Sequence, residues 1–260
     1  MTDSRTKATS FTELHIKGDP IIIYNAWDGG SAKTIASCGA KAIATGDHPV
    51  GFSHGFSNDD FDDFTFDMYL PTIKEIARAA GDLPYSVDIN NANGLTGDQL
   101  IERIRIILET GAVGINYEDG PGPDGNVLSE NEQAARIKTI RETADAAGVP
   151  LFINARTNIF IQADSSEHEG LLDEGVARAE AYAAAGASGF FVPGLLDIDL
   201  ITQLTARVEL PVNIIRLPGA PSTKELATAG VARVSYGPMP QIAMTEWLKQ
   251  QATTALRGDV

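Results

Sequence analysis

The chain has 260 residues, of which 43% are hydrophobic and 21% charged, an ordinary composition for one large soluble domain. No run of about 18 apolar residues marks a membrane span, and the formal net charge of −15 argues against binding to nucleic acid or to an anionic lipid surface. The polar start, 1–11, lacks the apolar core of a signal peptide, and a single cysteine excludes an internal disulfide. We therefore expect a cytoplasmic protein.

Short β-rich runs alternate with helix-like runs along the chain. The expected strands cover 21–25, 41–45, 84–88, 112–117, 150–154, 189–192, 211–215 and 232–235. The expected helices cover 30–37, 67–80, 97–109, 129–147, 171–185, 197–206, 222–228 and 239–256. A long loop rich in glycine and aromatic residues, 46–65, follows the second strand, and a turn-rich stretch, 120–125, follows the fourth.

These eight strand–helix units predict an α/β fold, a single (β/α)8 TIM barrel covering residues 1–260, because parallel strands joined by helices close a barrel at this number. An open doubly wound sheet is the alternative. Residues 1–18 would form an N-terminal lead-in, and 239–260 a C-terminal helical segment. Several helices should end at a glycine that caps them before the next strand. These glycines are Gly39, Gly111, Gly148, Gly186 and Gly230.

Two carboxylates stand at the ends of neighbouring expected strands, where barrel enzymes carry their active sites. Asp88 ends the third strand and Glu118 follows the fourth, so both can face one point above the barrel. Such a pair suits magnesium, which accepts one or two protein carboxylates and keeps several waters. The alternative is that each carboxylate caps the helix after it, and position alone does not decide between the two.

Arg156 follows the fifth expected strand, and its planar guanidinium can bind a substrate carboxylate through two hydrogen bonds. The alternative is a salt bridge to Glu118 or Asp119.

The loop at 46–65 is a candidate lid over the site, or else an ordinary loop packed on the barrel rim. Its Gly-x-Ser-x-Gly run, 51–55, neither follows a strand directly nor opens a helix, which argues against a hydrolase elbow. Cys38 is expected to be a small buried residue.

Several of these segments together resemble the phosphoenolpyruvate mutase and isocitrate lyase superfamily. The resemblance extends in the right order over residues 21–248. The segments that carry it are Asn-Ala-Trp-Asp-Gly-Gly-Ser-Ala at 25–32, Ala-Ile-Ala-Thr at 42–45, Val-Asp at 87–88, Gly-Ile-Asn-Tyr-Glu-Asp at 114–119, Phe-Ile-Asn-Ala-Arg-Thr-Asn at 152–158, Ala-Ser-Gly-Phe-Phe-Val-Pro-Gly at 187–194 and Pro-Val-Asn at 211–213.

The resemblance implies a barrel enzyme that uses Mg²⁺, or alternatively Mn²⁺, and acts on a small anionic 2-oxo acid or its precursor through an enolate-like pyruvate. It implies that Asp88 ligates the metal and that Glu118 helps through the water shell of the ion. It also implies a homodimer or homotetramer in which the C-terminal helix is exchanged between subunits.

Position and resemblance together give three sets of candidate site residues. The catalytic candidates are Asp47, His48, Glu118 and Arg156. The candidates for binding substrate are Trp27, Thr45, Gly46, Asp47, Asn90, Arg156 and Asn213, with backbone amides near 45–47 lining an oxyanion site. The metal candidates are Asp88 and Glu118.

The sequence departs from the family pattern at three carboxylate positions, which are occupied by Asn58, Asn90 and Asn158. The loop with the cysteine acid of the isocitrate and methylisocitrate lyases is replaced by 120–127, which has no cysteine, so isocitrate lyase activity is not expected. The pair Asp47-His48 is also unusual at the oxyanion loop.

Three functions follow from these observations. The first is a magnesium-dependent lyase or decarboxylase acting on a small 2-oxo or 2-hydroxy di-acid through an enolpyruvate-like intermediate. The second is a P–C bond enzyme, a phosphonopyruvate hydrolase or phosphoenolpyruvate mutase, against which stands the absence of Lys or Arg between Glu118 and Arg136. The third is a barrel that has lost this chemistry and binds a ligand or a partner.

Overall fold

The computed structural model describes residues 2–122 and 125–258. Eight parallel strands form one sheet in the order β1-β8-β7-β6-β5-β4-β3-β2. A single bridge between Ala26 and Thr45 joins the two ends of this order, so the sheet nearly closes on itself. The predicted (β/α)8 TIM barrel is therefore confirmed, and the open sheet is wrong. The expected turn-rich stretch at 120–125 includes Pro123 and Asp124, which lie outside the described residues, as do Met1, Asp259 and Val260 of the predicted domain.

The strands are short and, apart from Ile22 and the last residues of two strands, buried, as expected for a parallel sheet covered by helices. They are β1 Ile21–Ile23, β2 Ile43–Ala44, β3 Tyr85–Asp88, β4 Gly114–Glu118, β5 Phe152–Arg156, β6 Gly189–Phe191, β7 Val212–Ile215 and β8 Arg233–Ser235. The register places Asp88 beside Asn116, and Glu118 beside Arg156. Neighbouring strands therefore deliver the candidate carboxylates and the arginine to the same end of the barrel.

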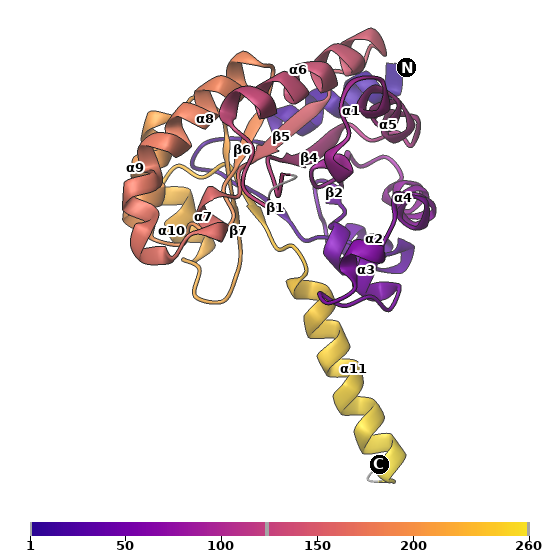
Figure 1. Cartoon of the computed structure of the whole chain (residues 1–260). Coiled ribbons are helices and arrows are strands. Elements are labelled where there is room, and N and C mark those ends of the chain that lie inside the picture. Colours follow the sequence, from indigo (N-terminus) through magenta and orange to yellow (C-terminus); the bar gives the residue numbers. More distant parts are fainter. Residues whose placement is uncertain (1, 123–124, 259–260) are drawn as a thin grey trace.

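The helices surround the strands (Figure 1). They are α1 Thr2–Glu13, α2 Gly29–Ser37, α3 Asp47–Ser53, α4 Phe66–Ala80, α5 Gly97–Glu109, α6 Glu130–Ala146, α7 Ile159–Gln162, α8 Leu172–Ala184, α9 Ile198–Arg207, α10 Thr223–Thr228 and α11 Met239–Arg257, with 3-10 turns η1 Phe61–Asp63, η2 Ala92–Gly94 and η3 Ser165–Leu171. The glycines expected to cap helices all have a positive φ, between +73° at Gly148 and +99° at Gly186.

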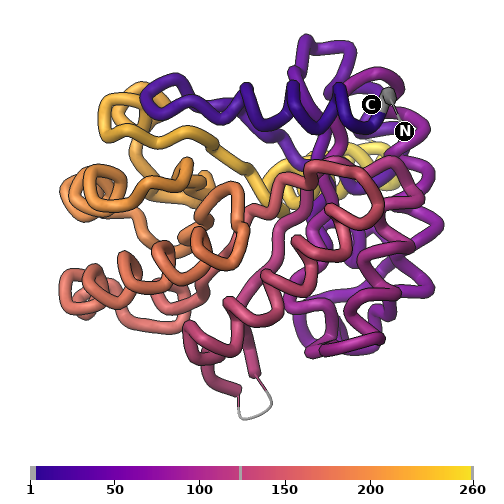
Figure 2. The backbone as a smooth tube through the Cα atoms, turned by 90° about the horizontal axis from the view of Figure 1, so that it is seen from above, coloured from indigo at the N-terminus to yellow at the C-terminus, as the bar shows by residue number. Residues whose placement is uncertain are grey.

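Helix α1 forms within the predicted lead-in, where no helix was expected. It lies at the end of the barrel opposite α3 (Figure 1), and Figure 2 shows it running along one side of the molecule in indigo. Phe11 and His15 pack under the strands against Phe152, with the His15 and Phe152 rings stacked 3.9 Å apart. The helix therefore covers the barrel end that is remote from the candidate site.

Two expectations about local structure are wrong. The stretch at 46–65 is not all loop, because α3 begins at Asp47, directly after β2, with Gly46 in extended conformation before it. The Gly-x-Ser-x-Gly run lies partly within this helix, where Ser53 donates to the carbonyl oxygen of Val50. Cys38 is exposed and not buried, because it caps the outer end of α2.

Helix α11 projects away from the barrel (Figure 1). It carries large apolar side chains that are exposed in the single chain, namely Ile242, Met244, Trp247, Leu248 and Leu256. Within the described ranges, none of the helices is both long and apolar enough to cross a membrane.

Candidate active site

Asp88, Glu118 and Arg156 meet at the C-terminal ends of β3, β4 and β5. Asp88 accepts hydrogen bonds from the backbone amide of Asn90 (3.2 Å) and from Nδ2 of Asn116 (3.3 Å). A Glu118 oxygen lies 3.0 Å from the Arg156 guanidinium, which is the salt bridge considered as the alternative role of this arginine. Capping by the carboxylates is wrong, because Thr96 and Ser129 stand at the N-caps of α5 and α6.

Burial and mutual repulsion make the charges of both carboxylates costly. Burial is the main cause that raises the pKa of Asp88 to about 6; the charge of Asp47 acts in the same direction and Arg156 opposes it. Burial is also the main cause that raises the pKa of Glu118 to about 7. Arg156 lowers this pKa, whereas the charges of Asp88 and Asp47 raise it further. The site therefore holds more negative charge than Arg156 alone compensates.

A divalent cation fits this donor set. Asp88 and Glu118 offer carboxylate oxygens, which magnesium prefers, and the cation would relieve the uncompensated charge. In the part of the chain that the structure describes, no group of three or more His, Cys, Asp and Glu side chains is arranged to hold a metal ion. An ion here would therefore rely on water for most of its ligands, as magnesium commonly does.

Asp47 and His48 form a second pair at the start of α3. Nδ1 of His48 lies 2.9 Å from the Asp47 carboxylate, and Nδ2 of Asn90 donates to the same oxygen at 2.6 Å. The imidazole stacks on the Phe61 ring at 4.1 Å. Burial alone would lower the pKa of His48, but the hydrogen bond and charge of Asp47 raise it above its ordinary value. His48 is thus held in one orientation and favoured in its protonated form.

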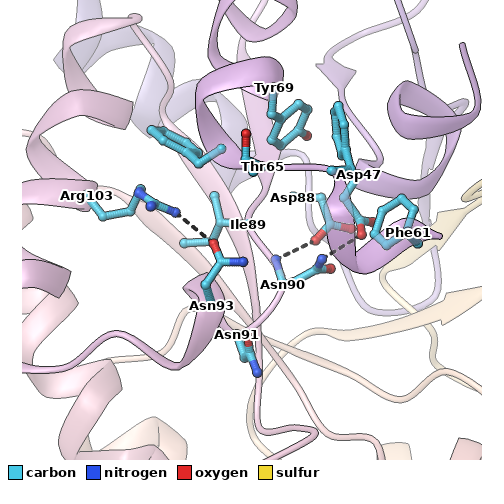
Figure 3. Close-up of a pocket in the computed structure, with 12 residues that line it drawn as sticks. Asp47, Phe61, Thr65, Tyr69, Asp88, Ile89, Asn90, Asn91, Asn93 and Arg103 are labelled. Atoms are coloured by element: carbon cyan, nitrogen blue, oxygen red, sulfur yellow. Dashed lines mark hydrogen bonds between the residues drawn. The ribbon is translucent and has the colours of Figure 1, made fainter. Parts of the chain in front are cut away.

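Asn90 connects the carboxylates of the site (Figure 3). Its side chain binds Asp47, its backbone amide binds Asp88, and its carbonyl oxygen accepts from the amide of Glu118 at 2.9 Å. Its φ of 49° lies in the left-handed region, which asparagine tolerates better than most residues. This conformation lets one residue reach all of its partners.

Asn158 supports the other side of the site. Its Nδ2 donates to Glu118 (3.2 Å) and to the carbonyl of Gly120 (2.9 Å), and its Oδ1 accepts from Nε of Arg156 (2.8 Å). The Asn158 backbone amide donates to the fully buried Asp119, at 2.9 Å. Asn158 therefore fixes both members of the Glu118–Arg156 pair.

A cavity of about 870 Å³ opens above these residues, lined among others by His48, Glu118, Arg136, Arg156 and Asn158. A smaller pocket next to it contains Asp47, Asp88 and Asn90 (Figure 3). The cavity has room for a small acid and presents cationic groups from three elements.

The family model for phosphoenolpyruvate phosphomutase matches residues 11–256. The chain belongs to the phosphoenolpyruvate phosphomutase family. Its relatives include the 2-methylisocitrate lyase of Escherichia coli, 29% identical over 66% of this chain and 58% of the relative, and oxaloacetate decarboxylase 2 of Pseudomonas fluorescens, 26% identical over 91% and 78%. A solved structure of a candidate phosphonomutase from Burkholderia cenocepacia is 41% identical, covers 98% of this chain and 99% of that one, and has a TM-score of 0.90.

Three other residues that were predicted to bind substrate do not line this cavity. Thr45 is fully buried beneath the site, where its hydroxyl accepts from the Asp88 amide (3.0 Å) and binds the hydroxyl of Tyr69. Trp27 does not line the cavity but a groove between α2 and α11. Asn213 lies inside the barrel, where its Oδ1 accepts from Ser235.

Sequence reasoning missed the polar side chains inside the barrel, which lie two residues before the ends of their strands. Asn116 precedes Glu118 by this spacing, and Arg233 precedes Ser235. Asn154, which the sequence placed among the candidates at the end of the fifth strand, precedes Arg156 in the same way. Residues two apart on a strand share a face, so the spacing itself could have placed them on the inner face below the site. Asn25, a polar residue that the sequence places at the end of the first strand, donates to the carbonyl of Thr45 at 2.8 Å.

Proposed function

We propose that this protein is a magnesium-dependent lyase or decarboxylase that cleaves a carbon–carbon bond in a small 2-oxo or 2-hydroxy di-acid through an enolpyruvate-like anion. The observation that carries the proposal is the group formed by buried Asp88, which lines the smaller pocket, and by buried Glu118 and Arg156, which line the adjoining cavity. Two relatives are named 2-methylisocitrate lyase and oxaloacetate decarboxylase, and both names refer to cleavage of a carbon–carbon bond in a small acid with two or three carboxylates.

In this proposal Asp88 holds the ion directly and Glu118 holds it through water, with Mn²⁺ as a substitute for Mg²⁺. When bound, the ion supplies positive charge next to the oxygen on which negative charge develops. Arg156 leaves its pairing with Glu118 to bind a substrate carboxylate. The amide of Thr45 already donates to the carbonyl of Ser86, so those of Gly46 and Asp47 are the oxyanion donors of that stretch.

His48 is proposed as the residue that moves the proton. Asp47 occupies its Nδ1, which leaves Nε2 as the nitrogen available to the cavity that His48 lines. In the decarboxylation of a 2-oxo di-acid, the carbon–carbon bond breaks, CO2 leaves, the electron pair passes into the enolate, and His48 donates a proton to the enolate carbon. This assigns to His48 the acid role for which the family's lyases use the missing cysteine.

A P–C bond activity is the second candidate, and one observation favours it. Arg136 of α6 lines the same cavity as Arg156, so a second arginine is present although the loop after β4 has none. A phosphonate carries more charge than a carboxylate and would use both. The solved structure that is 41% identical to this chain is that of a candidate phosphonomutase.

A screen for pyruvate release tests the proposal. Oxaloacetate, 2-methylisocitrate, other 2-substituted malates and phosphonopyruvate are offered with Mg²⁺ or with EDTA. We expect pyruvate from a di-acid only with Mg²⁺, and at least about a hundredfold less with Asp88→Asn. Asp98→Asn, on the exposed start of α5, serves as the matched control. Phosphorus NMR with phosphonopyruvate separates the second candidate.

Two outcomes would count against the proposed lyase. Turnover that persists in EDTA and in Asp88→Asn would reject the metal-dependent site. No turnover of any acid in the panel would favour the third function, a barrel that binds a ligand or partner.

We also propose that the chain is a homodimer or homotetramer in which α11 packs against another copy. The exposed apolar side chains of α11 and the groove it borders with α2 support this, because a monomer would leave Trp247 and Leu248 in water.

A further inference from the structure

Arg233 is a charged side chain enclosed inside the barrel. It begins β8, is only 1% exposed, and has the largest of the fully buried side chains. Its Nε donates to Ser235 (3.0 Å) and its Nη2 to Oδ1 of Asn116 (3.3 Å). Among the described residues its Nη1 has no hydrogen-bond partner, and no carboxylate forms a salt bridge with it. A buried cation without a contacting anion is costly, so its charge must be compensated at a distance.

The anion that compensates Arg233 is Asp88, and the side chain of Asn116 lies between the two. Asn116 accepts from Arg233 through Oδ1 and donates through Nδ2 to the carboxylate of Asp88, at 3.3 Å in both bonds. Asn154 donates to the same Oδ1 at 2.9 Å and so fixes the direction of the Asn116 amide. This chain of hydrogen bonds joins the interior cation to the proposed metal ligand.

Among the described residues, Asp88 is the charged group that raises the pKa of Arg233. Burial and the charge of Arg233 lower the pKa of His15 to about 3, so His15 is neutral at physiological pH and adds no charge near Arg233. Burial lowers the pKa of Arg233 to about 10, and the charge of Asp88 opposes this. Arg233 therefore remains protonated at neutral pH and has its electrostatic partner in the active site.

We infer that Arg233 is a built-in counter-cation of the active site, which balances Asp88 from inside the barrel whenever no divalent ion is bound. Asn116 acts as a spacer, so that Arg233 supplies charge without occupying the carboxylate oxygens that face the cavity. A fixed cation behind Asp88 repels an incoming cation, so Arg233 also keeps the affinity for a divalent ion low enough for exchange. This second consequence rests on the proposed metal site, whereas the first does not.

A double-mutant cycle in metal-free protein tests the first consequence. The variants are Arg233→Met, Asp88→Asn and the two combined, compared by urea unfolding in EDTA. We expect Arg233→Met to destabilise the protein, and to destabilise it less when Asp88 is already replaced, so that the combined variant is more stable than the sum of the single effects predicts. If Arg233→Met alone does not fold, folding of the combined variant shows the same compensation. Additive effects, or a combined variant that also fails to fold, would overturn the inference.

Binding of Mn²⁺, followed by electron paramagnetic resonance, tests the second consequence. We expect Arg233→Met to bind Mn²⁺ about tenfold more tightly than the wild type, because a nearby like charge has been removed. Arg233→Lys, which keeps the charge, and Ser235→Ala, which removes only the Nε acceptor, should bind like the wild type. Unchanged or weaker binding by Arg233→Met would overturn the inference. A wild type that binds no Mn²⁺ would instead reject the proposed metal site, and the metal-free cycle would still decide the role of Arg233.

Discussion

Replacing His15 by phenylalanine should make the protein less sensitive to acid. His15 is 8% exposed, stacks on Phe152, and donates from Nδ1 to the carbonyl of Phe11 at 2.7 Å, while its Nε2 has no partner among the described residues. Burial lowers its pKa from 6.5 to about 3 in the folded protein. The unfolded chain therefore takes up a proton first as the pH falls, and stability present above pH 6.5 is lost toward pH 3.

The size of this effect follows from the two pKa values. At pH 8 both states hold a neutral His15, and at pH 5 protonation of the unfolded chain costs about 2 kcal/mol of stability. Phenylalanine keeps the stacked ring but loses the bond to Phe11, a cost of about 1 kcal/mol that does not vary with pH.

Urea unfolding of both proteins at pH 8 and pH 5 measures the difference. We expect the wild type to lose about 2 kcal/mol more than His15→Phe between the two pH values. Comparing the two proteins cancels the contributions of the active-site carboxylates, which are common to both. Equal losses would refute the assignment of acid sensitivity to His15.

Three further predictions concern the site and the assembly. Asn158→Leu removes the amide that donates to Glu118 and accepts from Arg156, so kcat/KM for pyruvate release should fall about ten- to hundredfold; an unchanged value would show that Asn158 does not position this pair. His48→Gln should lower kcat about a hundredfold with little change in KM, while His54→Gln, whose ring binds Thr72, should stay near wild type; equal effects would reject His48 as the proton carrier. Trp247→Asp on α11 should shift the sedimentation coefficient toward that of a monomer, whereas an unchanged assembly would place the subunit interface elsewhere.

The barrel could be predicted from the sequence because the residues that define each strand and each helix end lie next to one another in the chain. Each strand is a short apolar run, and glycines such as Gly111 and Gly186 mark where a helix must end before the next strand. The order of these signals is enough to predict eight parallel units. Asp88 and Glu118 could be placed together for the same reason, since adjacent parallel strands bring their ends to one rim.

The hydrogen bonds and packing contacts around the site could not be predicted from the sequence, because they join segments that are distant in the chain. Helix α1 has a polar sequence whose few apolar residues, such as Phe11, gain a partner only when the barrel is formed. The three asparagines looked like lost carboxylates, whereas Asn90 and Asn158 donate to the acids that remain. Arg233 and Asn116 stood inside apolar strands; their spacing could have placed them on the inner face, but only the hydrogen bonds show that they connect to Asp88.

Calorimetric titration with oxalate, a planar mimic of enolpyruvate, tests the central claim most directly, because it needs no knowledge of the true substrate. The account predicts that oxalate binds the wild type in Mg²⁺ but not in EDTA, and that Asp88→Asn and Arg156→Leu both lose this binding while remaining folded. Equal affinity for oxalate with and without Mg²⁺, or full binding by Asp88→Asn, would contradict it.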